Sequence, residues 1–343
     1  MENIKLDLRS DTVSKPTPEM MDAMMKAEVG DDVFGEDPSV NALQNYAAQL
    51  FGMEAALFCS SGTQTNQIAI KIHTQPGAEV ICDARAHIYL YEGGGIAFNS
   101  SASAKLIQSD RGLFSADDVK DCINEDNVHF PKSSLVCIEN TVNKGGGACW
   151  DWEEILKIKS LCESHSIPFH LDGARLFNAL VAQKQEAKQF GQIFDTISIC
   201  LSKGLGAPVG SLLLGSTQHI YQAKRIRKVM GGGMRQAGFI AAAGLFALQN
   251  NVNRLTVDHE HAKFIADIIQ KKSWLKFMYP VETNIIIFKT TDELPADLLT
   301  KKLHEKGIKI SNMGKNFVRL VFHLNQSSAD IDFLANTLQN IDN

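Results

Sequence analysis

Lys203 stands where its amine could act as a nucleophile. It follows the apolar run TISICLS and precedes the turn GLGAP, so we expect it to project from the end of a buried strand into a glycine-lined turn. Burial there would favour the neutral amine, which forms a Schiff base with a carbonyl group. A lone lysine is more often a solvated loop residue, so its neighbours must decide between these readings.

An aspartate and an arginine follow a second apolar run upstream of this lysine. Asp172 ends IPFHLD and Arg175 follows in DGAR. Open α/β sheets bind ligands at the carboxyl ends of their strands, so Asp172 and Lys203 should share one edge. An acid that keeps a pyridine nitrogen protonated and a lysine that carries an aldehyde are the two parts that a pyridoxal-phosphate (PLP) site needs. The alternative for Asp172 alone is a helix N-cap.

The segment CSSGTQTNQIAI lies between a predicted strand and a predicted helix. It would offer free backbone N–H groups and hydroxyls to an anion at the helix start, from Ser60, Ser61, Gly62 and Thr63. Serine and glycine are also common in ordinary helix caps, so the segment alone is a weak signal. Together with Asp172 and Lys203 it predicts a phosphate-binding turn.

The elements that must position these residues are short apolar runs separated by helical or loop segments. Near-continuous apolar strands of this kind predict a mainly parallel sheet that is covered on both faces. The helical spacing in DWEEILKIKSLCESH, with Asp151 as its cap, predicts a crossover helix. The predicted strands are AALFCS, EVICDA, SLVCIE, IPFHLD, TISICLS and GSLLLG.

The pattern changes after GGGMRQAGFIAAAGLFALQNN. A long amphipathic helix over about 254–272 is followed by strand signals in TNIIIFKT and NFVRLVFHL, around a helix near 296–306. We therefore expect two domains. Residues 1–252 would form an N-terminal arm and a large domain, and residues 253–343 a small α/β domain.

Composition restricts the class of protein and its compartment. The net charge is −5 and the basic residues are dispersed, which argues against nucleic-acid binding. Seven cysteines without a CxxC pair are typical of a reducing compartment, so we expect a cytoplasmic protein. No stretch approaches the roughly 18 apolar residues of a membrane span. Neither a membrane nor a metal ion is expected as a partner.

At the level of whole motifs, the chain resembles the L-threonine aldolases, which belong to the aspartate-aminotransferase-like PLP enzymes of fold type I. The resemblance implies an α/β fold with a mainly parallel seven-stranded sheet in the large domain. It covers nearly the whole chain and rests on the segments LRSDT, GDDVFGEDP, SSGTQTNQ, AHIYLYEGGG, HLDGARLFNA, CLSKGLGAPVGSLLLG and GGGMRQAG.

The resemblance implies a role for each matching residue toward the cofactor. His87 would stack on the cofactor ring, Asp172 would pair with the ring nitrogen, and Lys203 would carry the aldehyde. The remaining contacts would be Gly62 and Thr63 to the phosphate, Arg175 to the ring hydroxyl, and Arg235 to a phosphate in a neighbouring subunit. The resemblance thus implies a homo-oligomer with shared sites, and we expect a tetramer.

The implied reaction is cleavage of a β-hydroxy-α-amino acid, such as threonine or allo-threonine, into glycine and an aldehyde. The residues implied for substrate binding are Ser10, Arg175 and Arg319, which would hold the α-carboxylate, together with Tyr91. Either His87 or His129 could be the base that removes the β-hydroxyl proton, because an imidazole suits proton transfer near neutral pH. The alternatives are β-elimination from a serine- or cysteine-like substrate and a non-catalytic protein that kept the fold.

Two positions depart from the family's usual pattern. Phe34 stands in DVFGEDP where tyrosine is often found, and Val142 stands in ENTVN where histidine is often found. We expect these changes to alter the polarity of the pocket and the substrate preference, and to leave the class of reaction unchanged.

Overall fold

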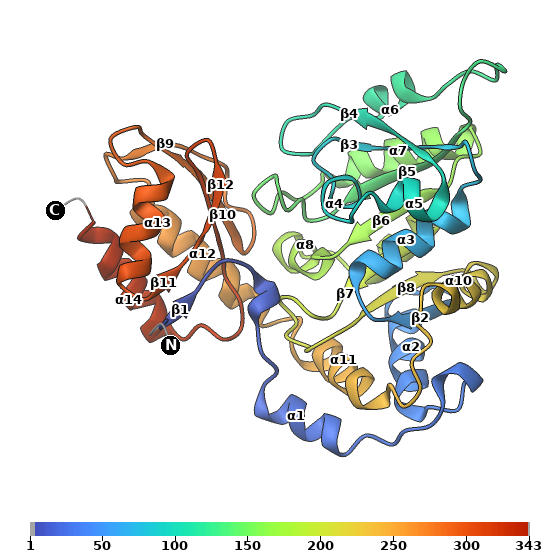
Figure 1. Cartoon of the computed structure of the whole chain (residues 1–343), viewed down its shortest axis with the longest axis horizontal. Coiled ribbons are helices and arrows are strands. Elements are labelled where there is room, and N and C mark those ends of the chain that lie inside the picture. Colours follow the sequence, from blue (N-terminus) through green and yellow to red (C-terminus); the bar gives the residue numbers. More distant parts are fainter. Residues whose placement is uncertain (1–3, 342–343) are drawn as a thin grey trace.

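A computed structural model describes residues 4–341 and shows two α/β units (Figure 1). The larger unit contains a seven-stranded sheet in which β8 alone runs antiparallel to the other strands. In spatial order the strands are β2 (Ala55–Cys59), β8 (Ser211–Gly215), β7 (Thr196–Cys200), β6 (Phe169–Gly173), β5 (Ser133–Glu139), β3 (Glu79–Asp83) and β4 (Ser103–Ile107). The expected mainly parallel sheet is confirmed, and β4 is the strand that the sequence did not predict.

Helices cover both faces of this sheet, which explains why its strands read as continuous apolar runs. On β5, Val136 and Ile138 pack into one hydrophobic core, whereas Leu135 and Cys137 pack into another on the opposite face. The helices are α1 (Pro18–Met25), α2 (Pro38–Phe51), α3 (Gly62–His73), α4 (His87–Leu90), α5 (Gly95–Ser100), α6 (Ala116–Cys122), α7 (Trp152–Ser164), α8 (Leu176–Gln183), α9 (Ala187–Ile193), α10 (Thr217–Val229) and α11 (Gly238–Asn250).

The crossover helix predicted from its spacing is α7. Asp151 caps it as expected, because its carboxylate accepts a hydrogen bond from the N–H of Glu154. The carboxylate of Glu154 accepts from the N–H of Ala116, which begins α6, at 2.7 Å. Glu154 therefore ties two helices together.

The smaller unit consists of an antiparallel sheet with helices against it. Its sheet has the order β12-β13-β10-β9. The elements are α12 (Leu255–Ile269), β9 (Leu275–Met278), β10 (Ile285–Thr290), α13 (Ala296–Glu305), β11 (Ile308–Lys309), β12 (Ser311–Gly314), β13 (Phe317–Val321) and α14 (Ser328–Gln339). The sequence indicated α12, β10, α13 and β13, and it did not indicate the two-residue strand β11, the edge strands β9 and β12, or the last helix.

The hydrophobic core changes over within α12, close to the expected boundary at residue 253. Leu255 packs into the core of the large unit, whereas Ala262 and Ile265 pack into that of the small one. The N-terminal arm does not follow this division. Its strand β1 (Leu6–Asp7) pairs in parallel with β11, and Leu6 and Leu8 are buried in the core of the small unit. No helix within residues 4–341 is long and apolar enough to cross a membrane.

Candidate active site

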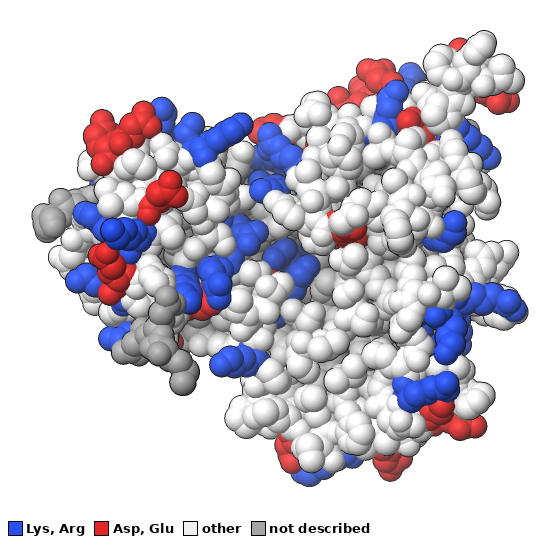
Figure 2. All heavy atoms as spheres, in the orientation of Figure 1, with Lys and Arg blue, Asp and Glu red and all other residues white. Residues whose placement is uncertain are grey.

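A cavity of about 490 Å³ lies between the two units, beside the carboxyl edge of the large sheet. Its lining residues include four cations and no carboxylate, and Figure 2 shows lysine and arginine side chains gathered along this junction. Such a lining suits an anionic ligand. The lining residues are Ser10, Thr12, His87, Tyr91, Asn143, Lys144, Arg175, Lys203, Ser311, Asn312, Met313 and Arg319.

Lys203 reaches this cavity from the turn after β7, as its sequence context predicted. Two contacts fix the turn. The carbonyl of Lys203 accepts hydrogen bonds from the N–H of Gly206 at 2.8 Å and from the hydroxyl of Ser14 at 3.0 Å. The lysine is therefore held by its backbone while its side chain faces the cavity.

Asp172 lies near the end of β6 and is buried. Its carboxylate accepts from the N–H of Ala174 at 3.1 Å and from the side-chain amide of Asn66 at 3.0 Å. Glu139 lies beside it on β5 and is also buried. Burial and the nearby charge of Asp172 raise the pKa of Glu139 to about 7.

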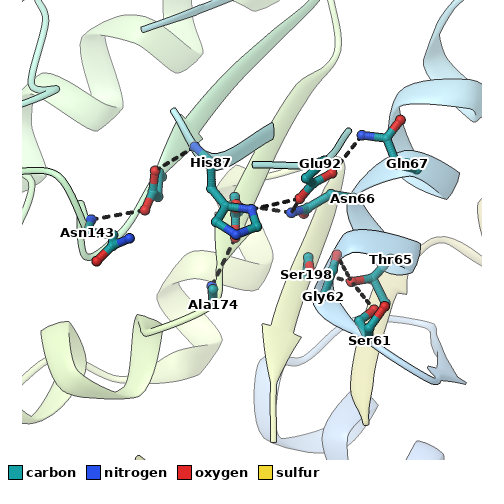
Figure 3. Close-up of polar contacts among 12 residues, drawn as sticks. Ser61, Gly62, Thr65, Asn66, Gln67, His87, Glu92, Asn143, Ala174 and Ser198 are labelled. Atoms are coloured by element: carbon teal, nitrogen blue, oxygen red, sulfur yellow. Dashed lines mark hydrogen bonds and ion pairs between the residues drawn. The ribbon is translucent and has the colours of Figure 1, made fainter. Parts of the chain in front are cut away.

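His87 begins α4 and lines the cavity (Figure 3). Its Nδ1 lies 2.9 Å from the carboxylate of Glu92, and its backbone N–H donates to Glu139 at 3.0 Å. Burial alone would lower the pKa of His87, but the hydrogen bond to Glu92 and the charge of Asp172 outweigh it, so the pKa is raised. Tyr91 lies beside it, with the two rings 5.7 Å apart.

Ligand atoms of His87, Glu92 and Asp172 lie within 4.8 Å of one another, a spacing that could hold a metal ion. The amide nitrogen of Asn66 already donates to both carboxylates, at 2.9 and 3.0 Å. A cation would have to displace this donor, so the arrangement fits a hydrogen-bonded network better than a metal centre.

The turn predicted to bind an anion lies at the amino end of α3. The hydroxyl of Ser61 caps the helix through the N–H of Gln64, and the N–H groups of Gly62 and Thr63 have no acceptor within the helix. A Cβ at Gly62 would lie 2.5 Å from the sulfur of Cys200, so only glycine fits here without a shift. Neither Gly62 nor Thr63 lines the cavity described above.

Arg175 forms a bidentate ion pair with Asp11, which arrives from the N-terminal arm. Its Nε and Nη2 lie 2.8 and 2.7 Å from the two carboxylate oxygens, and both side chains are buried. Burial alone would raise the pKa of Asp11, but the charge of Arg175 outweighs it and lowers the pKa. The arm thus places Ser10 at the cavity wall and keeps Arg175 in a fixed orientation.

Arg319 reaches the cavity from β13 of the small unit. Its Nη1 donates to the side chain of Asn143 at 2.7 Å and its Nη2 to the carbonyl of Arg9 at 2.9 Å. Its Nε is buried without a hydrogen-bond partner among residues 4–341. Burial and the charge of Arg175 lower the pKa of Arg319. A buried guanidinium with an unused donor suits the carboxylate of a small ligand.

Besides Gly62, Thr63 and the buried Asp172, four further residues singled out from the sequence do not line the cavity within one chain. His129 lies on an exposed loop before β5, whereas the site lies at the Glu139 end of that strand. The strand has seven residues, so its two ends are about 20 Å apart. Arg235 is about half exposed and pairs with Asp31 at 2.8 Å. Phe34 is 74% exposed, and Val142 is buried against Gly112. The change at Val142 therefore falls outside the cavity wall.

The sequence reasoning missed five polar residues of the site, namely Asp11, Asn66, Glu92, Glu139 and Asn143. Each of them lies in a segment that it had singled out, in LRSDT, SSGTQTNQ, YEGGG or ENTVN. Their residue types allowed a helix cap or a solvated loop equally well. Only their burial and mutual contacts reveal their part in the site.

Comparison with known proteins places these features in a family. The family model for beta-eliminating lyases matches residues 7–293. The low-specificity L-threonine aldolase of Escherichia coli K12 is 42% identical over 94% of this chain and 95% of its own. Low-specificity L-threonine aldolase 1 of Arabidopsis thaliana is 38% identical over 97% and 95%. The solved structure of Leishmania major threonine aldolase superimposes with a TM-score of 0.85 at 19% identity, over 98% and 99% of the two chains.

Proposed function

The chain belongs to the beta-eliminating lyases and, within them, to the low-specificity L-threonine aldolases, and from this premise we propose that it uses PLP to cleave L-threonine and L-allo-threonine into glycine and acetaldehyde. One observation carries the proposal. Lys203 and Arg319 lie on the wall of one cavity, and the buried Asp172 is within 4.8 Å of His87 on the same wall.

When bound, PLP supplies an electron sink for the negative charge left on Cα as the Cα–Cβ bond breaks. The donor set fits this cofactor. Asp172 would hold the pyridine nitrogen protonated and Lys203 would hold the aldehyde carbon. Gly62 and Thr63 would hold the phosphate, because their N–H groups lie at a helix start that admits no Cβ at Gly62. His87 would pack against the ring.

Three side chains would hold the substrate. The unused Nε of Arg319 and the hydroxyl of Ser10 would bind the α-carboxylate, with Arg175 completing the cationic wall. Fixing the carboxylate fixes the orientation of the bonds around Cα and so favours cleavage of Cα–Cβ. Tyr91 would contact the side chain of the substrate.

His87 is the better candidate for the base that takes the β-hydroxyl proton. Its ring lines the cavity, whereas His129 of the same chain lies at the opposite edge of the sheet. His129 would have to act from another copy of the chain. After cleavage, a proton delivered to Cα completes glycine.

Product analysis tests the proposed reaction. Purified protein incubated with PLP and L-threonine or L-allo-threonine should release acetaldehyde and glycine in equal amounts. β-Elimination is the second candidate reaction, because the matching family model describes beta-eliminating lyases. Pyruvate and ammonia from serine or cysteine, without acetaldehyde from threonine, would replace the proposal by this reaction.

We also propose that the protein is a homotetramer whose active sites contain residues from two subunits, and that it is located in the cytoplasm. Exposed apolar side chains support assembly, among them Phe34 and Val229, which is 88% exposed. Arg235 lies on the surface near Phe34, where it could reach the phosphate of a neighbour. All seven cysteines are unpaired, which supports a reducing compartment.

Mixed oligomers test the shared site. Lys203→Ala and Arg235→Ala should each be inactive alone. If Arg235 serves the neighbouring subunit, co-expression of the two variants should restore activity, because some sites then combine two intact residues. Co-expression of two differently tagged Lys203→Ala chains is the matched control and should restore nothing. Failure of the first mixture would contradict the shared site while leaving the reaction untouched.

A further inference from the structure

Glu92 is a buried carboxylate that the proposed reaction does not use. Its side chain is fully buried, and three donors converge on its two oxygens (Figure 3). The side-chain amide of Asn66 and Nδ1 of His87 each lie 2.9 Å from Oε1, and the amide of Gln67 lies 2.6 Å from Oε2. Both amide nitrogens can only donate, so the pattern is that of an ionised carboxylate acting as acceptor throughout.

The orientation of Asn66 follows from the charges on either side of it. Its Nδ2 faces Glu92 at 2.9 Å and Asp172 at 3.0 Å, and the reversed amide would place an oxygen against two carboxylates. Its Oδ1 therefore faces Nε2 of His170 at 3.2 Å. Burial lowers the pKa of His170 to about 4, and Nδ1 of this imidazole lies 2.9 Å from the hydroxyl and 3.1 Å from the carbonyl of Thr196.

The same reasoning assigns the proton on His87. Because Glu92 is an acceptor, Nδ1 of His87 must be the donor, and a neutral His87 then has an unprotonated Nε2. The backbone N–H of His87 is held separately by Glu139 at 3.0 Å. His87 is thus held at its backbone N–H and at Nδ1 of its ring, and only the contact of Nδ1 sets the tautomer.

We propose that Glu92 is a positioning residue that holds His87 as the Nδ1–H tautomer and, through the shared amide of Asn66, fixes the carboxylate of Asp172. One buried group then orients both the imidazole that would pack on the cofactor ring and the acid that would face the ring nitrogen. This inference rests on the proposed function for its role in catalysis. The tautomer itself is a property of the protein without cofactor.

The charges around His87 determine what loss of Glu92 would do. Three carboxylates act on the imidazole from different elements, and cations lie along the same cavity. The carboxylates are Glu92 after α4, Glu139 on β5 and Asp172 on β6. The cations are in the cavity wall, which also contains the phenol of Tyr91; they are Lys144, Arg175, Lys203 and Arg319. Glu92→Gln removes the only carboxylate that accepts a side-chain hydrogen bond from His87 among residues 4–341.

The first test reads the proton on His87 in the cofactor-free protein. At a pH above the raised pKa of His87, protein with ¹⁵N-labelled histidine should show Nδ1 protonated and Nε2 unprotonated for His87, assigned by comparison with His87→Phe. In Glu92→Gln the Nε2–H tautomer should become populated and the pKa of His87 should fall by about one unit or more. An Nε2–H tautomer in the unaltered protein, or an unchanged tautomer and pKa in Glu92→Gln, would overturn the proposal.

The second test separates positioning from folding. Turnover per bound cofactor should fall by about tenfold or more in Glu92→Gln, with KM for threonine changed less than about threefold, because the carboxylate grip is intact. Glu282→Gln is the matched control, since that carboxylate pairs with Arg111 at 2.7 Å and does not contact His87. Equal losses in both variants would contradict a specific role for Glu92.

Asn66→Ala provides an independent variant should Glu92→Gln fail to fold. It removes the bridge to Asp172 and leaves the contact of Glu92 with His87. Cofactor affinity should fall while the His87 tautomer stays Nδ1–H. If Asn66→Ala also changed the tautomer of His87, or left cofactor affinity unchanged, then Asn66 would not act on Asp172 separately from the contact of Glu92 with His87. An enzyme without aldolase activity but with this tautomer would refute the proposed function alone.

Discussion

At the scale of single residues, the site contains buried charged groups whose hydrogen bonds are incomplete without a ligand. Arg319 is the clearest case, because two of its nitrogens are occupied by Asn143 and Arg9 and the third is unused. Leaving a buried donor unpaired costs about 1–3 kcal/mol. Binding of a carboxylate would recover this free energy, which gives the arginine a role in affinity.

We expect Arg319→Ala to act mainly on substrate binding. KM for L-threonine should rise by about 10- to 100-fold, which corresponds to loss of a charge-assisted hydrogen bond. The absorbance of the bound cofactor should persist, because Arg319 is not among the residues that would hold PLP. Steady-state kinetics with a parallel spectrum of the variant measure both. An unchanged KM would contradict the placement of the α-carboxylate.

Lys203→Ala should act on turnover and on cofactor attachment, in contrast to Arg319→Ala. Turnover should fall to background, because the amine proposed to carry the aldehyde is removed, and the characteristic absorbance of protein-bound PLP should be lost. Borohydride treatment followed by mass analysis of the peptide containing residue 203 checks the attachment in the unaltered protein. Cofactor attached at a different lysine would remove Lys203 from its role.

Glu139 makes stability depend on pH. Its pKa is about 7 in the folded protein against an ordinary value of 4.5, so the folded state binds the additional proton between these values. Its contribution to stability is therefore complete below about pH 4.5 and is lost as the pH rises through 7. Glu139→Gln removes this titration, so its effect on the stability of the cofactor-free protein should be more favourable at pH 8 than at pH 4.5, by on the order of 3 kcal/mol at most. Thermal denaturation at the two pH values tests the sign, and a larger gain at the lower pH would contradict it.

At the scale of elements, the carboxyl ends of adjacent strands converge on the site. Asp172 lies one residue before the end of β6, Glu139 ends β5, and the turn after β7 holds Lys203. The helix that starts beyond β2 packs against the same edge, and Gly62 lies next to Cys200 at the end of β7. The start of α3 therefore packs closely against the end of β7, and this contact shapes the predicted phosphate site.

A double-mutant cycle tests this packing. Gly62→Ala should weaken cofactor binding by about tenfold and destabilise the protein by about 1–3 kcal/mol, because its Cβ would lie 2.5 Å from the sulfur of Cys200. Adding Cys200→Ala removes the clashing atom and should restore most of the loss relative to Cys200→Ala alone. Additive effects in cofactor titration and thermal denaturation would show that the sulfur is not the obstacle.

At the scale of the whole molecule, the N-terminal arm connects the two units through the site. Its strand β1 belongs to the small unit, Asp11 pairs with Arg175 of the large unit, and Ser14 contacts the turn of Lys203. The cavity walls supplied by Ser10 and Arg319 therefore come from opposite ends of the sequence. A change in the arm should affect the site as well as the fold.

Asp11→Ala should cost about 3–5 kcal/mol, because it leaves Arg175 buried without its partner. Asp7→Ala is the matched control, since the pair of Asp7 with Arg9 is partly exposed and should contribute about 0–1 kcal/mol. Chemical denaturation of both cofactor-free variants measures the difference. Similar losses in the two would contradict the role assigned to the buried pair.

The sequence by itself determined six of the seven strands of the large sheet, the crossover helix α7 and the order of the chemical groups along the chain. Apolar runs flanked by glycine-rich turns specify buried strands locally, and residues at strand ends necessarily meet at one edge of a parallel sheet. Lys203, Asp172 and the turn at Gly62 could therefore be predicted from their local context. The resemblance to a family added the roles proposed for His87 and Arg319, which local context alone left open.

Only the tertiary structure decided which polar residues are partners. Glu92, Asn66 and Asp11 look like caps or loop residues in the sequence, and their roles arise from contacts across 26, 106 and 164 positions. It also placed His129 at the far edge of the sheet and Val142 outside the cavity. Such contacts follow from how elements pack, and burial then makes each charge depend on its partner. No local pattern carries that information.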